Sequence, residues 1–156
     1  MIKRSCKMFL MAGALAILSG VLPVWGQTRS GMCTNAILRG DYSFIVEGLV
    51  FPAPGVEVAV RGVHLTNFDG DGGITQVDHL VIGGQPPALD WTPGTGTYKV
   101  NADCTGTMRI TVPSTGDFVN LRFVVSGQGR QIFAVVTAPF SGPSRTVTST
   151  GIRRDY

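Results

Sequence analysis

The stretch TMRITVPSTGDFVNLRFVV, residues 107–125, decides the fold class. On both sides of its centre, apolar and polar residues alternate, as they do in a strand with one face on a core and the other in solvent. The residues expected to face inward are Met108, Ile110, Val112, Val119, Leu121, Phe123 and Val125. The segment PSTGD between the two runs consists of turn-forming residues. The stretch therefore predicts two antiparallel strands joined by a short connection.

Short β-branched and aromatic runs between glycines and prolines continue along the chain, which favours an all-β domain. The expected strands are 41–50, 56–68, 74–82, 96–101, 107–112, 118–125, 131–137 and 146–152. Short connections favour pairing between sequential strands, and closing the sheet removes its two exposed edges. We expect residues 40–154 to form a single antiparallel eight-stranded up-and-down β-barrel, with a two-sheet β-sandwich as the alternative.

The N-terminus has the features of a secretory signal peptide, which we assign to residues 1–26. The basic residues Lys3, Arg4 and Lys7 precede an apolar run that is shorter than the ~20 residues needed to cross a bilayer. Residues 27–39 are expected to form an N-terminal segment before the barrel. The sequence therefore predicts an exported protein, periplasmic or extracellular, with no integral membrane span after cleavage.

The charge of the chain gives no indication of a nucleic-acid partner. The full sequence has 13 Lys and Arg against 10 Asp and Glu, and three of the basic residues belong to the predicted signal. The remaining chain is formally neutral, whereas nucleic-acid binding needs a clustered positive face.

The cysteine content agrees with export. Cys6 lies in the signal, which leaves Cys33 and Cys104. A lone pair in an oxidising compartment predicts a disulfide, and no CxxC motif indicates a metal site.

The glycine-rich stretch NFDGDGGITQVDH, residues 67–79, resembles a calcium loop at first sight. Counted from Asp69, an EF-hand loop would match at its first and third positions, Asp69 and Asp71. Its fifth, sixth and twelfth positions would be Gly73, Ile74 and Leu80, which do not match. The paired Asp-Gly steps instead favour a hairpin tip.

Three residues near this tip are candidates for a metal site: His64, His79 and Asp78. Pairing about residues 70–73 would place the two histidines opposite each other, within reach of the carboxylate. The alternative is a pair of ordinary rings on a sheet, because no third ligand stands at a recognisable spacing. We therefore predict no metal ion.

No convergent catalytic set is visible, and an enzyme is the less favoured class. The chain has no GxSxG motif. Glu47 is the candidate acid or base if it enters the barrel, and surface placement is the alternative. Trp91, in the irregular segment 83–95, is a candidate ligand lid, and a structural plug is the alternative. Other aromatic residues are expected to fill the core, namely Phe44, Phe51, Phe68, Tyr98, Phe118, Phe123, Phe133 and Phe140.

Three segments together resemble a family of small exported bacterial proteins with allene-oxide-cyclase-barrel-like domains. They are GDYSF at residues 40–44, FDGDG at residues 68–72 and GTYKVNADCTGT at residues 96–107. The resemblance implies a closed barrel related to the plant cyclases and to other ligand-holding, calycin-like barrels. The carboxylate, tyrosine and water ligands of the plant enzymes have no matching motif here, so no catalytic residue is carried over.

The sequence thus favours an exported, disulfide-bridged barrel whose expected partner is a small apolar molecule, with no cofactor. One alternative is an isomerase- or cyclase-like enzyme acting on a lipid in the barrel. The other is an extracellular interaction or structural module that uses its loops. An eight-stranded barrel can be filled by side chains or can hold one small ligand, and the sequence leaves this open.

Overall fold

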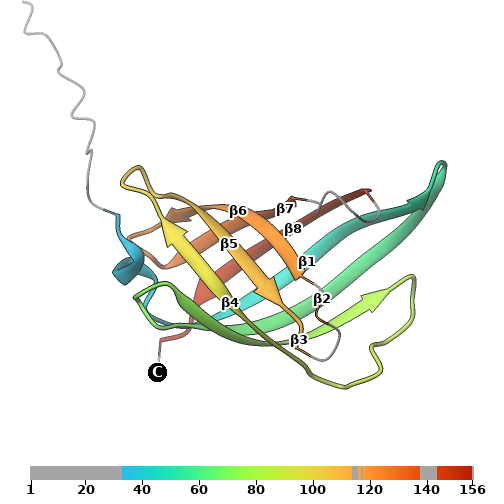
Figure 1. Ribbon diagram of the computed structural model, residues 1–156, viewed down its shortest axis with the longest axis horizontal. Coiled ribbons are helices and arrows are strands. Elements are labelled where there is room, and N and C mark those ends of the chain that lie inside the picture. Colours follow the sequence, from blue (N-terminus) through green and yellow to red (C-terminus); the bar gives the residue numbers. More distant parts are fainter. Residues whose placement is uncertain (1–32, 114–115, 117, 138–143, 156) are drawn as a thin grey trace, which may run out of the picture.

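The computed structural model describes residues 33–113, 116, 118–137 and 144–155, so the predicted signal peptide lies outside the described residues. The described chain forms a closed barrel of antiparallel strands, in which each strand pairs with its neighbours in sequence and β1 pairs with β8 (Figure 1). This confirms the up-and-down barrel. The elements are the 3-10 turn η1 (Asn35–Leu38) and the strands β1 (Gly40–Ala53), β2 (Val56–Phe68), β3 (Gly73–Ile82), β4 (Thr92–Val100), β5 (Thr105–Thr111), β6 (Phe118–Ser126), β7 (Gln131–Thr137) and β8 (Ser144–Arg153).

The expected strands match the observed ones closely, except that β4 begins at Thr92 rather than at Gly96. Pro93 and Gly94 weaken a strand prediction because proline donates no ladder hydrogen bond and glycine has no side chain to pack. Here Pro93 pairs with Val77 of β3, while pairing with β5 starts only at Thr95. Pro93 thus lies where its missing N–H is tolerated, on a stretch of β4 with one neighbour.

The tip between β2 and β3 is built around the carboxylate of Asp69. Its Oδ1 accepts hydrogen bonds from the backbone N–H groups of Asp71, Gly72 and Gly73, at 2.7, 2.9 and 2.9 Å. Gly70 and Gly72 have φ angles of +86° and +125°, which glycine adopts readily. These backbone hydrogen bonds hold the pKa of the Asp69 carboxyl below its ordinary value. The segment is a hairpin tip whose acid binds its own backbone.

The register of this hairpin differs by one residue from the expected one. His64 pairs with Asp78, and His79 pairs with Val63, so the predicted pairing of the two histidines is wrong. The cause is the length of the tip, because Asp69 takes part in closing a longer turn than the one assumed from the glycines. A shift of one residue moves a side chain to the other face of a sheet. His64 therefore faces the barrel interior, and His79 faces outward.

One end of the barrel is closed by η1, which lies at the same end as the C-terminus, opposite the projecting β1–β2 hairpin (Figure 1). The predicted disulfide is present, joining Cys33 to Cys104 with a Cα–Cα distance of 5.1 Å. Leu38 is fully buried in the core. Arg153 donates to the carbonyl oxygen of Ile37 at 2.6 Å and to the hydroxyl of Tyr42 at 3.1 Å. The disulfide and these hydrogen bonds hold the turn against the barrel.

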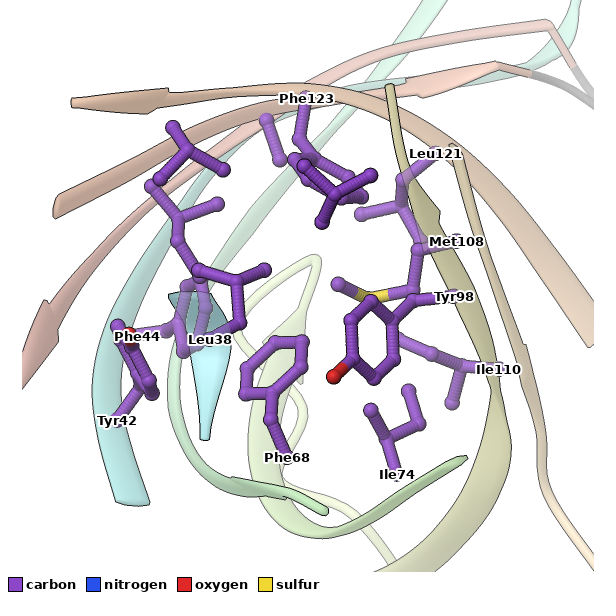
Figure 2. Packing of buried hydrophobic residues seen from close by; sticks show 14 of the residues in the cluster. Leu38, Tyr42, Phe44, Phe68, Ile74, Tyr98, Met108, Ile110, Leu121 and Phe123 are labelled. Carbon is purple, nitrogen blue, oxygen red and sulfur yellow. The ribbon is translucent and has the colours of Figure 1, made fainter. Parts of the chain in front are cut away.

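The core of this end is dense and aromatic. Figure 2 shows Leu38 among inward-pointing rings, with Phe68 between Tyr42 and Tyr98. The Phe68 ring meets both tyrosine rings edge-on, with centroids 5.1 and 5.0 Å apart. A second, smaller cluster of Val46, Val60 and Val147 lines the other half of the barrel. Large side chains thus fill the half near η1 and leave the far half more thinly packed.

The expected aromatic core is confirmed in part. Phe44, Phe68, Tyr98 and Phe123 are buried. Phe133 was expected inside, and this is wrong, because 47% of its surface is exposed on the outer face of β7. Two others are only partly buried and one lies outside the described residues, namely Phe51, Phe118 and Phe140 respectively. No helix among the described residues is long and apolar enough to cross a membrane.

Candidate functional site

The half of the barrel away from η1 contains a cavity of about 180 Å³. Every strand except β4 contributes to its wall. Its apolar lining consists of Val46, Val50, Val60, Leu80, Ile82, Ile110, Val112, Val119, Leu121, Val136 and Val147. Its polar lining consists of His64, Gln76, Asp78, Arg145 and Ser149. The cavity is thus an apolar space with a small number of polar groups, which is the usual composition of a small-molecule site.

Two glycines explain why β4 contributes no side chain to this wall. Gly94 and Gly96 occupy the inward positions of β4 that precede Tyr98. A Cβ atom on Gly94 would lie 2.9 Å from Cγ of Gln76 and 3.3 Å from Cγ2 of Ile110. The missing side chain therefore makes room for Gln76 to extend across the wall of the cavity.

Four polar side chains of β2 and β3 form a hydrogen-bonded row on the interior face. His64 Nδ1 lies 2.9 Å from the Thr66 hydroxyl, which donates to Gln76 Oε1 at 3.5 Å. Gln76 Nε2 in turn donates to Asp78 Oδ2 at 3.0 Å. We call these four residues the polar row. Thr66 and Asp78 are buried, so the row satisfies polar groups that would be costly to bury alone.

Burial sets the protonation behaviour of the row. The ring of His64 stacks on Phe44, with centroids 4.2 Å apart, and burial lowers its pKa to about 4. His64 is therefore neutral at neutral pH. Burial raises the pKa of the Asp78 carboxyl, against the opposing effects of the Gln76 hydrogen bond and the nearby His79. A carboxyl with a raised pKa inside a cavity is a common feature of functional sites.

The structure separates the three residues considered for a metal site. His79 lies outside the barrel, where its Nδ1 is 2.6 Å from the carbonyl oxygen of Asp90 and 3.3 Å from Oδ1 of the same residue. His64 and Asp78 lie inside, as neighbours across the strands. Among the described residues, no group of three His, Cys, Asp or Glu side chains could hold a metal ion.

The other two candidates lie outside the barrel. Glu47 is exposed on the outer face of β1, opposite Arg61 and Thr148 in the strand register. Trp91 is 49% exposed and meets the His79 ring edge-on, with centroids 6.0 Å apart. Neither side chain lines the interior cavity.

Sequence reasoning missed Thr66 and Gln76. The signal was present, because Thr66 shares one strand face with His64, and Gln76 shares one with Asp78. Both faces of β2 mix apolar and polar residues in the sequence, so the pattern does not show which face is interior.

A larger concavity of about 690 Å³ lies on the outer wall, over β5 to β8. Exposed side chains such as Val124, Phe133 and Thr148 line it. A small molecule there would keep much of its surface in water, whereas binding sites usually bury about 70–90% of a drug-sized ligand. The interior cavity is therefore the better candidate site.

Comparison with protein-family models and with curated proteins finds no match. Among solved structures, the chain is similar to a redesigned β-barrel, mFAP1, bound to DFHBI, with 19% identity over 76% of this chain and 97% of that chain and a TM-score of 0.47. It is also similar to the redesigned β-barrel b11L5F_LGL, with 18% identity over 81% of this chain and 100% of that chain and a TM-score of 0.49. At these levels the comparison supports no functional argument, and the assignment of the barrel rests on its own strand pairing.

Proposed function

We propose that this protein is a binding barrel that holds one small, largely apolar molecule in its interior cavity. One observation carries the proposal: a barrel densely packed near η1 has an apolar cavity of about 180 Å³ in its other half. Loss of packing contacts around a cavity destabilises a protein, so an apolar cavity that no ligand fills is a cost to the fold.

The size of the cavity limits the ligand. An engineered apolar cavity of about 150 Å³ binds benzene, whereas sites for drug-sized ligands measure about 300–1,000 Å³. The present cavity, at about 180 Å³, suits a single substituted ring or a short alkyl chain. A long-chain lipid would have to extend beyond it.

We also propose that the protein is exported and works in the periplasm or outside the cell. The signal-like residues 1–26 and the Cys33–Cys104 disulfide support this location, because disulfides persist in oxidising compartments. The resemblance to exported allene-oxide-cyclase-barrel-like domains agrees with both the closed barrel and the location. Fractionation of expressing cells, with N-terminal sequencing of the processed protein, tests it. Recovery of the full-length chain in the cytoplasm would refute it.

A second candidate function is an isomerase- or cyclase-like activity, which one observation favours. The cavity contains a carboxyl, Asp78, whose pKa is raised by burial, and a carboxyl can act as a general acid or base. A molecule that co-purifies with the protein would be incubated with wild type and with Asp78→Asn. Conversion by wild type alone would favour the enzyme, and unchanged ligand in both would favour simple binding.

The binding function is tested with toluene and indole, two apolar probes that match the cavity in scale. Both are expected to raise the melting temperature with increasing concentration, because a ligand that binds only the folded state stabilises it. Val147→Phe fills the cavity from β8 and should abolish this shift. Val135→Phe makes the same substitution on the outer face of β7 and should leave the shift intact. If neither probe shifts the melting temperature of the wild type, or if both variants respond alike, the cavity is not a binding site.

A further inference from the structure

Two polar atoms of the polar row are not used within it. Every fully buried side-chain nitrogen and oxygen of the described residues has a hydrogen-bond partner. Within the row, His64 bonds through Nδ1 and Asp78 through Oδ2. Among the described residues, neither His64 Nε2 nor Asp78 Oδ1 has a hydrogen-bond partner. Because no fully buried side-chain nitrogen or oxygen lacks a partner, both atoms are accessible. Both residues line the cavity, which makes these atoms available to a bound molecule.

The directions of the hydrogen bonds in the polar row determine whether His64 Nε2 and Asp78 Oδ1 donate or accept. The Asp78 carboxylate accepts from the Gln76 amide nitrogen, which leaves the Gln76 amide oxygen to accept the Thr66 proton. Thr66 has only one proton, so toward His64 its oxygen accepts and His64 Nδ1 carries the hydrogen. In a neutral imidazole the other nitrogen is then unprotonated. His64 Nε2 is therefore an acceptor, as is Asp78 Oδ1 in the ionised carboxylate.

The residues that carry these two acceptors are neighbours on the interior face of the sheet. His64 and Asp78 are direct partners in the register of β2 and β3, and side chains at such positions have Cβ atoms about 4.5–5.5 Å apart. A single head group can therefore meet both. It must donate hydrogen bonds, because two acceptors cannot bond to each other or to a third acceptor.

We propose that the cavity selects small apolar molecules with a hydrogen-bond-donating head group, a primary ammonium above a hydroxyl, held between His64 Nε2 and Asp78 Oδ1. This inference rests on the proposed binding function and specifies its ligand class. An ammonium has three donors and a charge opposite to that of Asp78, which offsets the cost of burying the carboxylate. A carboxylate ligand would instead place a second negative charge beside Asp78.

Arg145 is the charged group in the cavity wall that could reverse this preference. It pairs with Val50 in the register of β8 and β1, several residues farther from η1 than Ser149, which pairs with Val46. His64 pairs with Phe44 in the register of β2 and β1, so Arg145 and the His64–Asp78 pair lie at different levels along β1. The head-group pair of His64 and Asp78 thus operates apart from this guanidinium.

The test compares four probes with the same ring and different substituents: toluene, benzyl alcohol, benzylamine and benzoate. Binding to the purified protein is measured by NMR titration at neutral pH. We expect benzylamine to bind at least about tenfold more tightly than toluene, because hydrogen bonds between charged groups are roughly twice as strong as those between neutral groups. Benzyl alcohol should be intermediate and benzoate weakest.

Variants of Asp78 and His64 test whether these two residues cause the preference for benzylamine. Asp78→Asn should remove the advantage of benzylamine while toluene affinity stays within about twofold. Glu47→Gln, which removes an exposed carboxylate from the outer face, is the control that should change nothing. Should Asp78→Asn fail to fold, His64→Phe keeps a ring on Phe44, removes Nε2 and should lower the affinity for benzyl alcohol and benzylamine.

The outcomes separate the two proposals. Equal binding of toluene and benzylamine would overturn the head-group inference and leave the binding function standing. Tightest binding of benzoate would also overturn it and would assign recognition to Arg145. Failure of all four probes to bind would remove the binding function and this inference with it.

Discussion

Acidification from neutral pH to about pH 4 is expected to destabilise the barrel through His64. In the unfolded chain this histidine has an ordinary pKa of 6.5, and burial lowers the folded value to about 4. Between these values the unfolded state binds a proton that the folded state does not, so the free energy of unfolding falls as pH falls. The effect is absent above pH 6.5 and complete below pH 4.

The magnitude follows from the size of this pKa difference. One pKa unit corresponds to about 1.4 kcal/mol, so His64 removes at most about 3.5 kcal/mol of stability across the window. That is a large part of the ~5–15 kcal/mol typical of native proteins. Asp78 acts in the opposite sense, because its folded pKa is raised and its contribution to stability is present at low pH and lost as pH rises. The net slope of the wild type will therefore be smaller than that of His64 alone.

Urea unfolding at closely spaced pH values, for wild type and for His64→Gln, isolates the contribution of His64. The difference in unfolding free energy between the two proteins should change by up to about 1.4 kcal/mol per pH unit within the window and level off outside it. His79→Gln removes a histidine from the outer face and should keep the His64 component. A pH-independent difference between wild type and His64→Gln would refute the burial and neutrality assigned to this ring.

Three further outcomes follow from the same contacts. Replacing both Cys33 and Cys104 by serine opens a link with a sequence separation of 71 residues, and the chain-entropy model predicts a loss of about 4 kcal/mol, measurable as a lower urea midpoint. Asp69→Ala removes the acceptor of three backbone N–H groups at the hairpin tip and should lower the melting temperature, whereas Asp71→Ala leaves those three bonds in place and should not. Gly94→Ala places a Cβ against the Gln76 side chain and should change the affinity for a cavity ligand more than it changes the stability of the free protein. Melting temperatures measured with and without toluene would separate the two effects.

The barrel itself could be predicted because several strands display their faces openly. In β5 the buried residues Met108 and Ile110 alternate with Thr107 and Arg109, and at the centre of β6 the buried Leu121 and Phe123 alternate with Asn120 and Arg122. The disulfide was predictable for a different reason, because only Cys33 and Cys104 remain outside the signal-like segment. Neither prediction needs knowledge of how distant strands meet.

Strand β7 shows where alternation stops being informative. Its sequence QIFAVVT is apolar at nearly every position, so the burial of Ile132 and Ala134 and the exposure of Phe133 and Val135 leave no trace in composition. Only the pairing of Phe133 with Val124 on one side and Thr150 on the other determines which face looks outward.

The candidate site depends on the inner face and the register of β2 and β3, which the sequence predicts least well. The polar row lies on β2 and β3, where polar and apolar residues occur on both faces of each strand, so the pattern defines no inner face. The register is then set by the tip, where the Asp69 carboxylate binds three consecutive backbone N–H groups. A turn shorter by one residue would bring His79 opposite His64 and would move Asp78 away from it. The chemistry proposed for the cavity therefore follows from one acidic side chain at a surface turn, at a distance along the strands from the groups that it aligns.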